Sequence, residues 1–487
     1  MSQITASRSE QENWTAAMQY NELGQEIERI LPGDVISKWQ NDVAGRPTHH
    51  RISSQNRDTR RRVYNWDANH RLRSMVNELI GVKVTYGYDE FSNLVWSNQG
   101  AQFDFLHRNV DDVGNLYETK EKTDRVYGAG NRLLETREET FSYDDEGNLV
   151  QKVEKNGDTW KYEYYGNGMM AKVIKLDKTE VTFKYDSLGR RIEKCSEEKK
   201  TSFVWDGNTI LHEYFSQNDS AKFEKLVESS SQNKSEIPDN LVTWIFNDGF
   251  IPSAKITNEG NYSIISDHLG TPVEAYDEWG SLIWSVELDI YGRVKEQDGA
   301  FTDNKKIGSY ACKEEIEIDF IPFRFQGQYH DLSSGLYYNR FRYYDPAMGM
   351  YNQQDPIGLM GGMRLYGYVS DTNFWVDIFG LRKSSRNRKP KYVETKSTAR
   401  TKPRNENEAF AMDHIKKHPE NVIEIIKASE IGDKCYEGKG WSKIEQKVNG
   451  VNVHYMAKYN KGKMTEVTDF KFKDNKPKIK CRVKGNL

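Results

Sequence analysis

Near the C-terminus, a histidine and several lysines have residue types and spacing suited to proton transfer beside an anion. His454 and Lys458 are four residues apart, and Thr468, Lys471 and Lys473 follow them. Side chains in a strand alternate with a period of two, so His454 and Lys458 would share one face. Histidine can then act as general base or acid, with the two later lysines holding a phosphate and the threonine donating a hydrogen bond. The plain alternative is a structural histidine among solvated lysines.

Metal and cofactor chemistry has little support in the sequence. His414 and His418 are spaced i, i+4, a geometry that can bind a metal on a helix, but no HExxH glutamate lies between them and no third ligand is evident. The four cysteines form no CxxC pair, and no P-loop, dinucleotide-binding or GxSxG pattern occurs. We therefore expect neither a metal nor a cofactor.

A sequence repeat identifies the elements of the longer, preceding part of the chain. The unit approximates an aromatic residue, Asp, two variable residues, Gly, then Asn or Arg, and often Leu. Its copies at Tyr143, Tyr164, Tyr185 and Trp205 start 21, 21 and 20 residues apart. Looser copies start at Tyr20, Asp42, Trp66, Tyr88, Asp112, Tyr276 and Tyr291.

Each copy predicts a β-hairpin. Glycine accepts positive φ and aspartate bonds to its own backbone, so together they form a tight turn. Flanks such as 160–164 and 182–185 alternate as half-buried strands do. One hairpin cannot bury its face alone, so the copies must stack into a continuous sheet. We expect a mainly β repeat shell over 1–320, with an exposed polar loop insertion at 216–238.

Charge divides the chain into an acidic body and a basic tail. Residues 382–487 contain 27 Lys and Arg against 13 Asp and Glu, a net charge of +14. The rest of the chain carries 43 against 60, a net charge of −17. The basic part is the one suited to meeting an anion such as nucleic acid, although a solvated lysine-rich surface has the same composition.

The tail predicts a linker followed by a small α+β domain over 405–487. Residues 382–404 hold ten basic residues and one Glu without apolar periodicity, which is typical of a linker. Helices are predicted at 405–418 and 420–431. Strands are predicted at 442–448, 451–459 and 464–473.

In several motifs the chain resembles the YD-repeat, or RHS, family. Residues 267–273 (DHLGTPV) are similar to that family's DHLGTP element, and residues 325–346 and 354–359 are similar to its core signature. The likeness spans roughly 1–381. It implies a hollow β-cocoon that encloses a toxic C-terminal segment, with residues 321–381 as the core element at which the chain is cut.

The resemblance also implies a self-cleavage site. Asp355 and Asp377 would form an aspartyl-protease-like pair, with Arg342 beside them, that hydrolyses the peptide bond after Leu381. Two carboxylates held close together do not both ionise easily, so one activates water while its protonated partner polarises the scissile carbonyl. The chain departs from the family pattern at Ile378, where proline is expected. The alternative is that both aspartates simply cap tight turns.

The expected function is that of a polymorphic toxin used between competing bacteria. The order of elements in the tail resembles small ribonuclease toxins, so RNA is the expected substrate. The family implies a cognate immunity protein and a possible secretion-spike or delivery protein. The sequence shows no signal-peptide pattern and no apolar run that could span a membrane. We expect a cytoplasmic protein in the producer that is then secreted or delivered into target cells.

Two alternatives stay open. The many aromatic residues of the repeats could stack on sugars in a non-enzymatic surface or carbohydrate-binding protein. A toxin with deoxyribonuclease or ADP-ribosyltransferase activity would keep the same organisation and change only the chemistry of the tail.

Overall fold

The chain divides into two compact units, Met1–Arg386 and Asn387–Leu487. The computed structural model describes residues 2–9, 12–100, 104–197, 199–217, 238–295, 318–381, 384–385, 391–392, 411–412, 415–416, 419, 424–427, 441–448, 451–460 and 463–472. Nearly all of the predicted loop insertion at 216–238 and most of the predicted linker at 382–404 lie outside these residues.

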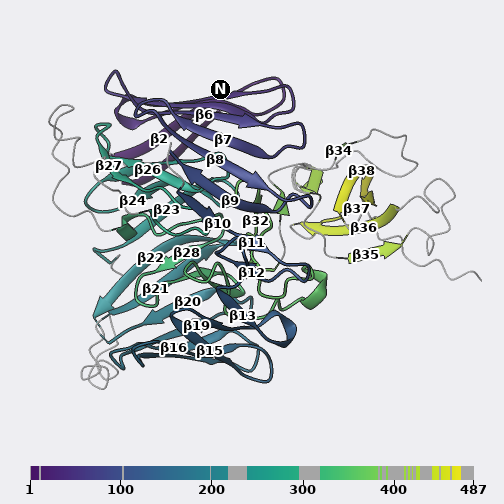
Figure 1. Ribbon diagram of the computed structural model, residues 1–487. Coiled ribbons are helices and arrows are strands. Elements are labelled where there is room, and N and C mark those ends of the chain that lie inside the picture. The colour runs from purple at the N-terminus through teal and green to yellow at the C-terminus, as the bar shows by residue number, and fades with distance from the viewer. Residues whose placement is uncertain are drawn as a thin grey trace, which may run out of the picture. The chain divides into compact units, whose positions relative to one another are not determined.

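The first unit consists of antiparallel strands, most of which pair with the next strand along the chain (Figure 1). Among its described residues, one sheet contains ten strands: β1 (Ser2–Ser9), β2 (Glu12–Tyr20), β3 (Glu26–Leu31), β4 (Val35–Asn41), β5 (Pro47–Ser54), β6 (Arg57–Trp66), β7 (Leu72–Asn77), β8 (Val82–Tyr88), β9 (Leu94–Gln99) and β10 (Phe105–His107). A short 3-10 turn, η1 (Pro32–Asp34), joins β3 to β4.

A second sheet continues the same pattern after the short pair β11 (Asn109–Val110) and β12 (Leu116–Tyr117). Its fifteen strands within the described residues are β13 (Arg125–Tyr127), β14 (Leu133–Thr136), β15 (Glu139–Tyr143), β16 (Leu149–Glu154), β17 (Thr159–Tyr164), β18 (Met170–Ile174), β19 (Glu180–Tyr185), β20 (Arg191–Cys195), β21 (Lys199–Asp206), β22 (Thr209–Gln217), β23 (Val242–Asp248), β24 (Ile251–Ile256), β25 (Asn261–Ser266), β26 (Pro272–Tyr276) and β27 (Leu282–Ser285). The turn η2 (Ala129–Asn131) lies between β13 and β14.

The turns of the repeat have the geometry that their residues predict. Gly189 has φ +73°, and the Asp186 carboxylate accepts the backbone N–H groups of Leu188 and Arg190, both at 2.9 Å. An aspartate bonded to its own backbone and a glycine at positive φ close the hairpin without strain. The predicted mainly β fold is confirmed.

In three successive copies, the aromatic residue accounts for the spacing of the repeat. The Tyr164 hydroxyl donates to the carbonyl of Leu149 at 2.8 Å. The Tyr185 hydroxyl donates to the carbonyl of Met170 at the same distance. The Trp205 indole N–H donates to the carbonyl of Arg191 at 2.8 Å. Since each acceptor directly follows the turn of the preceding copy, the aromatic side chain ties one hairpin to the hairpin before it.

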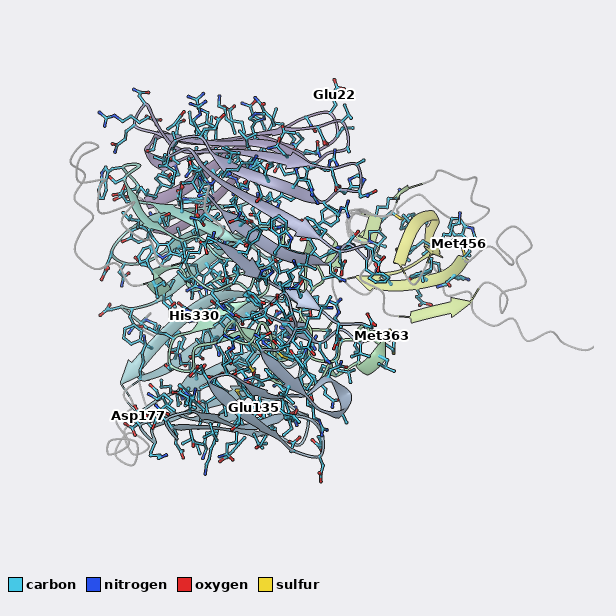
Figure 2. The ribbon with its side chains drawn as sticks, viewed as in Figure 1. Glu22, Glu135, Asp177, His330, Met363 and Met456 are labelled. Atoms are coloured by element: carbon cyan, nitrogen blue, oxygen red, sulfur yellow. The ribbon has the colours of Figure 1, made fainter. Side chains whose placement is uncertain are left out.

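The two large sheets share a hydrophobic core. Trp14 and Ile52 of the first sheet belong to the same buried cluster as Ala254 and Tyr276 of the second. Arg60 of β6 and Glu274 of β26 form a buried ion pair at 3.2 Å. Figure 2 shows the side chains that fill the unit between its strands. The repeats therefore form one body in which both sheets support the residues packed inside it.

Residues 318–381 pack against the second sheet and contain the predicted cleavage element. Tyr338 and Tyr343 lie in one buried cluster with Phe183 of β19. Close packing of this kind gives polar side chains on the same segment a fixed support. The segment comprises η4 (Ile318–Phe320), β28 (Tyr329–Asp331), β29 (Leu336–Asn339), β30 (Arg342–Asp345), β31 (Met350–Tyr351), η5 (Gly358–Met360) and β32 (Trp375–Val376), which pairs with β33 (Ser384–Ser385).

The described strands of the second unit form one sheet in the order β34-β38-β37-β36-β35. They are β34 (Lys391–Tyr392), β35 (Glu424–Lys427), β36 (Trp441–Val448), β37 (Val451–Asn460) and β38 (Lys463–Phe472). Helical residues at 411–412 and 415–416 bury Met412 and Ile415 in the same cluster as the sheet.

One element of the tail was predicted wrongly. The three C-terminal strands are present, but residues 424–427 of the helix predicted at 420–431 form strand β35 instead. Ile425 and Ile426 are β-branched and favour a strand. Pairing with β36 then supplies the backbone hydrogen bonds that a helix would have made locally.

Candidate functional site

Arg342, Asp355 and Asp377 meet in the interior of the first unit. Arg342 begins β30, while the two aspartates follow β31 and β32. Arg342 Nη2 donates to Asp355 Oδ2 at 3.1 Å and to Asp377 Oδ2 at 3.3 Å. All three residues are buried. The fold thus brings together the three residues to which the resemblance pointed, with one guanidinium nitrogen between two carboxylates.

Each carboxylate divides its oxygen atoms between a turn and the arginine. Asp355 Oδ1 accepts the Ile357 N–H at 3.1 Å, and Asp377 Oδ1 accepts the Leu381 N–H at 3.0 Å. These are the bonds expected of turn-capping aspartates. The second oxygen of each carboxylate instead meets Arg342, which is distant in sequence. Turn capping therefore accounts for the contacts of only one oxygen atom in each carboxylate.

Arg342 is held in one orientation by further contacts. Its Nη1 donates to the carbonyl of Leu365 at 3.0 Å, and its Nε donates to the carbonyl of Gly380. The guanidinium carbon lies 3.8 Å from the centre of the Tyr351 ring. A guanidinium that is bonded along its edges and covered by an aromatic face cannot turn away from the carboxylates without losing these contacts.

Tyr351 and Asn339 complete the site and were missed by the sequence analysis. The Tyr351 hydroxyl donates to Asp377 Oδ2 at 3.0 Å. Asn339 Nδ2 donates to the Tyr351 hydroxyl at 2.7 Å and to the carbonyl of Asp377 at 2.8 Å. Tyrosines are abundant in this part of the sequence, so only the fold shows which of them reaches the carboxylate.

The two carboxylates have different surroundings. Burial raises the pKa of Asp355 and the nearby Asp377 carboxylate adds to the rise, while Arg342 and the Ile357 N–H oppose it. Asp355 is therefore suited to holding the proton of the pair. Asp377 accepts hydrogen bonds from Arg342, Tyr351 and the Leu381 N–H, an arrangement that suits an ionised carboxylate.

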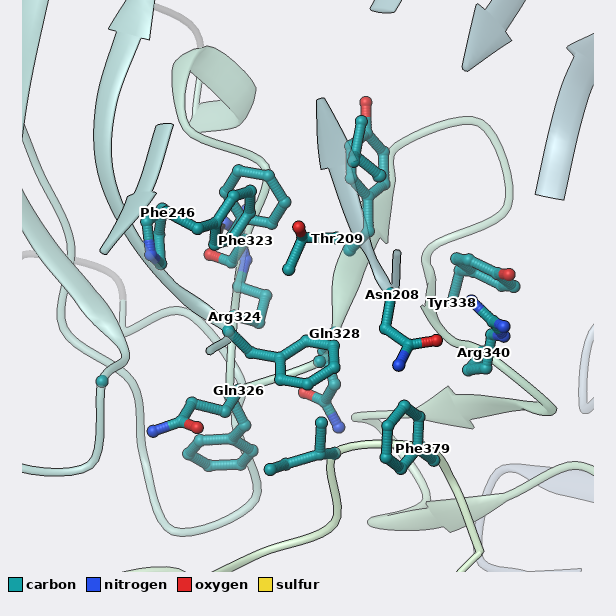
Figure 3. A pocket seen from close by; sticks show the side chains of 18 of the residues that line it. Asn208, Thr209, Phe246, Phe323, Arg324, Gln326, Gln328, Tyr338, Arg340 and Phe379 are labelled. Carbon is teal, nitrogen blue, oxygen red and sulfur yellow. Dashed lines mark hydrogen bonds between the residues drawn. The ribbon is translucent and has the colours of Figure 1, made fainter. Parts of the chain in front are cut away.

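The segment from Asp377 to Leu381 is held as a bound peptide would be. The Phe341 N–H donates to the carbonyl of Phe379 at 3.3 Å. The Phe379 ring meets Phe250 edge-on, with 5.3 Å between ring centres. Phe379 and Ile378 both line an apolar cavity beside the segment (Figure 3). These contacts fix the main chain leading to the peptide bond after Leu381.

A second group of polar residues lies on the sheet of the second unit. His454 Nε2 lies 2.9 Å from Glu445 Oε2 of the neighbouring strand, although sequence analysis did not single out Glu445. Lys471 pairs with His454 in the register of β37 and β38, and Thr468 pairs with Met456. A carboxylate beside an imidazole orients the ring and can share in proton transfer.

Lys458 follows His454 by four positions in β37, about 13 Å along the strand at 3.3 Å per residue. Its Nζ lies 5.8 Å from the centre of the Trp441 ring. The sheet therefore places Glu445 nearer to the histidine than Lys458.

The remaining predicted residues of the tail are placed only in part. The side chains of Thr468 and Lys471 are not described, and Lys473, His414 and His418 lie outside the described residues. In the part of the chain that is described, no group of three or more His, Cys, Asp or Glu side chains could hold a metal ion. No helix there is long and apolar enough to cross a membrane.

Residues 32–368 match the family model described as Teneurin YD-shell. The chain belongs to the YD-shell family. The matched part of this YD-shell protein includes Arg342 and Asp355 and ends before Asp377 and the second unit.

Three curated relatives of the YD-shell protein carry names of activities or toxins. The "Double-stranded DNA deaminase toxin A" of Burkholderia cenocepacia is 31% identical over 61% of this chain and 20% of its own length. The "Toxin protein Tse5" of Pseudomonas aeruginosa is 32% identical over 50% of this chain and 18% of its own. The "Probable deoxyribonuclease RhsA" of Dickeya dadantii is 28% identical over 52% of this chain and 16% of its own length. The chain spans a fifth or less of the length of these relatives.

Proposed function

We propose that this YD-shell protein is an RHS-type toxin of interbacterial competition, whose first unit cuts the chain after Leu381 and whose second unit is a metal-independent ribonuclease. The observation that carries the first part is the buried pair of Asp355 and Asp377 bridged by Arg342, with the Leu381 N–H bonded to one of the carboxylates. The toxin names of the relatives support the general role.

In the proposed cleavage, Asp355 acts as the acid and Asp377 as the base. Asp377 takes a proton from a water molecule whose oxygen attacks the carbonyl carbon of Leu381, and protonated Asp355 donates to the carbonyl oxygen. Arg342 stabilises the negative charge that develops. Breakdown of the intermediate passes a proton to the departing nitrogen of Arg382. The products are a carboxyl group on Leu381 and an amino group on Arg382.

The intact mass of the purified protein tests this step. We expect two fragments that meet between Leu381 and Arg382 in the wild type, and a single intact chain in Asp355→Asn and in Asp377→Asn. Asp144→Asn is the matched control, because Asp144 caps a repeat turn by accepting the Asn148 N–H at 2.7 Å and takes no part in the pair. An uncut wild type would overturn the proposed cleavage.

The ribonuclease assignment rests on the second unit, because the relatives show that a YD-shell can accompany different chemistries. One is named for a DNA deaminase and another for a probable deoxyribonuclease. RNA cleavage without a metal needs a base for the 2′-hydroxyl, an acid for the leaving oxygen and cations for the phosphate. The Glu445–His454 pair supplies the first two, and the net charge of +14 over 382–487 favours a polyanion.

The assignment is tested by incubating the protein with RNA in the presence of EDTA. We expect cleavage by the wild type and a loss of about 100-fold or more in Glu445→Gln and in His454→Ala. His212→Ala, which changes a histidine of the shell, is the control. Cleavage of DNA alone, deamination of DNA or consumption of NAD would replace the ribonuclease with one of the alternative toxin activities.

The proposal also includes partners. A cognate immunity protein with an acidic binding face would protect the producing cell, and a delivery protein would carry the toxin into its target. A non-enzymatic carbohydrate-binding role has less support, because repeat aromatics such as Tyr164 and Tyr185 use their hydroxyl groups to join hairpins.

A further inference from the structure

Gly361 lies where the acid of the pair and the scissile carbonyl face each other. A Cβ atom placed on Gly361 would be 2.1 Å from Asp355 Oδ2 and 2.5 Å from the carbonyl oxygen of Leu381. Real Cβ atoms essentially never come within 3.0 Å of another heavy atom in this way. Any side chain at Gly361 would therefore have to displace the carboxyl group, the carbonyl group or the turn itself.

The backbone does not require glycine at this position. Gly361 has φ −76° and ψ −21°, a right-handed helical conformation that every L-residue adopts. Its neighbours differ, because Gly358 has φ +56° and Gly362 has φ +138°, and a Cβ on either would meet nothing within 4 Å. Gly361 therefore differs from the other two glycines of the turn: its backbone would accept any residue, but a side chain would not fit.

The large side chains of the turn point to solvent and do not pack it against the site. Leu359, Met360 and Met363 are 74%, 83% and 76% exposed, and Met363 lies at the edge of the first unit in Figure 2. The turn instead approaches the carboxyl group of Asp355 and the carbonyl of Leu381 with the bare Cα of Gly361.

We propose that Gly361 is a positioning residue for self-cleavage. Its missing side chain lets the turn close over Asp355 and Leu381, so that the carboxyl group stays in reach of the carbonyl oxygen it must protonate. The inference rests on the proposed cleavage after Leu381 and adds to it a residue that takes part in no proton transfer. A displacement of about 1 Å in such a geometry costs roughly 100-fold in rate.

The test follows cleavage of newly synthesised full-length chains by mass in a pulse–chase experiment. We expect Gly361→Ala to cleave at least about 100-fold more slowly than the wild type and Gly361→Val more slowly still, with the first unit of Gly361→Ala still unfolding in one cooperative transition. Gly362→Ala strains the same turn without filling the space, and Gly166→Ala adds a Cβ in the open at a distant turn. Both controls should cleave at nearly the wild-type rate.

A pH profile separates positioning from a general loss of structure. Where the added Cβ displaces the Asp355 carboxyl from Arg342, the contact that lowers its pKa is lost, and the alkaline limit of the remaining cleavage should move to higher pH. An unmoved limit would mean that the turn or the Leu381 carbonyl has been displaced instead. Cleavage of Gly361→Ala at the wild-type rate, or an equal loss in Gly362→Ala, overturns the positioning role while leaving the proposed cleavage intact. An uncut wild type overturns both.

Discussion

At the scale of single residues, Tyr351 should matter through one hydroxyl group. Tyr351→Phe removes the donor to Asp377 Oδ2 and keeps the ring against Arg342. We expect self-cleavage to slow by about 10- to 100-fold, because a hydrogen bond to an ionised group contributes about 1.5–3 kcal/mol. Tyr344→Phe is the control, since its hydroxyl donates to the carbonyl of Tyr291 at 2.6 Å. Equal rates for the two variants in a pulse–chase measurement would contradict this role of Tyr351.

Asp371 gives a second prediction at this scale, and it concerns stability. Burial raises the pKa of Asp371 to about 6. Between about pH 4 and pH 6 the folded state therefore holds a proton that the unfolded state has released, so stability falls as the pH rises through this range.

Asp371→Asn removes the charge and keeps an oxygen for the Asn373 N–H, which now bonds to Asp371 at 2.9 Å. We expect the variant to raise the free energy of unfolding by about 1–3 kcal/mol at pH 7.5 and to change it little at about pH 4. Denaturant unfolding at both pH values measures this. A gain of the same size at both would show that the buried charge is not its cause.

At the scale of elements, the segment whose cleavage we propose is closely approached by the loop before β28. Gly327 has φ +85°, and a Cβ on it would lie 2.0 Å from the carbonyl oxygen of Ile378. Gly327→Ala should push the segment away from Arg342 and slow cleavage by about 100-fold. Gly335→Ala is the matched control, because Gly335 has φ +71° with nothing within 4 Å. The control should cost only backbone strain, about 1–2 kcal/mol of stability, and cleave normally.

The elements that sequence analysis predicted correctly are those specified by residues close together in the sequence. An aspartate and a glycine within one turn specify each hairpin, so a hairpin could be inferred from a stretch such as 185–191 and the sheet from the recurrence of that stretch. Strand β35 was missed because its pairing with β36 is not local. Tyr351, Asn339, Gly361 and Glu445 were missed for the same reason, since each acts on a residue that only the fold brings near.

At the scale of the whole molecule, the matched family region contains only part of the proposed chemistry. The YD-shell match covers 32–368, with Arg342 and Asp355, while Asp377 and the second unit follow it. The acidic charge lies with the shell and the basic charge with the tail. Under the proposed cleavage, such a shell would release different tails in the same way, each preceded by a segment that completes the carboxylate pair.

Because Asp377 belongs to the segment whose cleavage we propose, self-cleavage should be intramolecular. Asn339, Phe341 and Arg342 hold that segment through the carbonyl groups of Asp377, Phe379 and Gly380. A second chain could present its own scissile bond only by displacing the resident segment, which carries one of the two carboxylates. We expect the cleavage rate to be independent of protein concentration, and the Asp355→Asn chain to remain intact when mixed with freshly synthesised wild type. Cleavage of the variant in that mixture would mean that the segment leaves its place, and that these backbone contacts do not confine the reaction to a single chain.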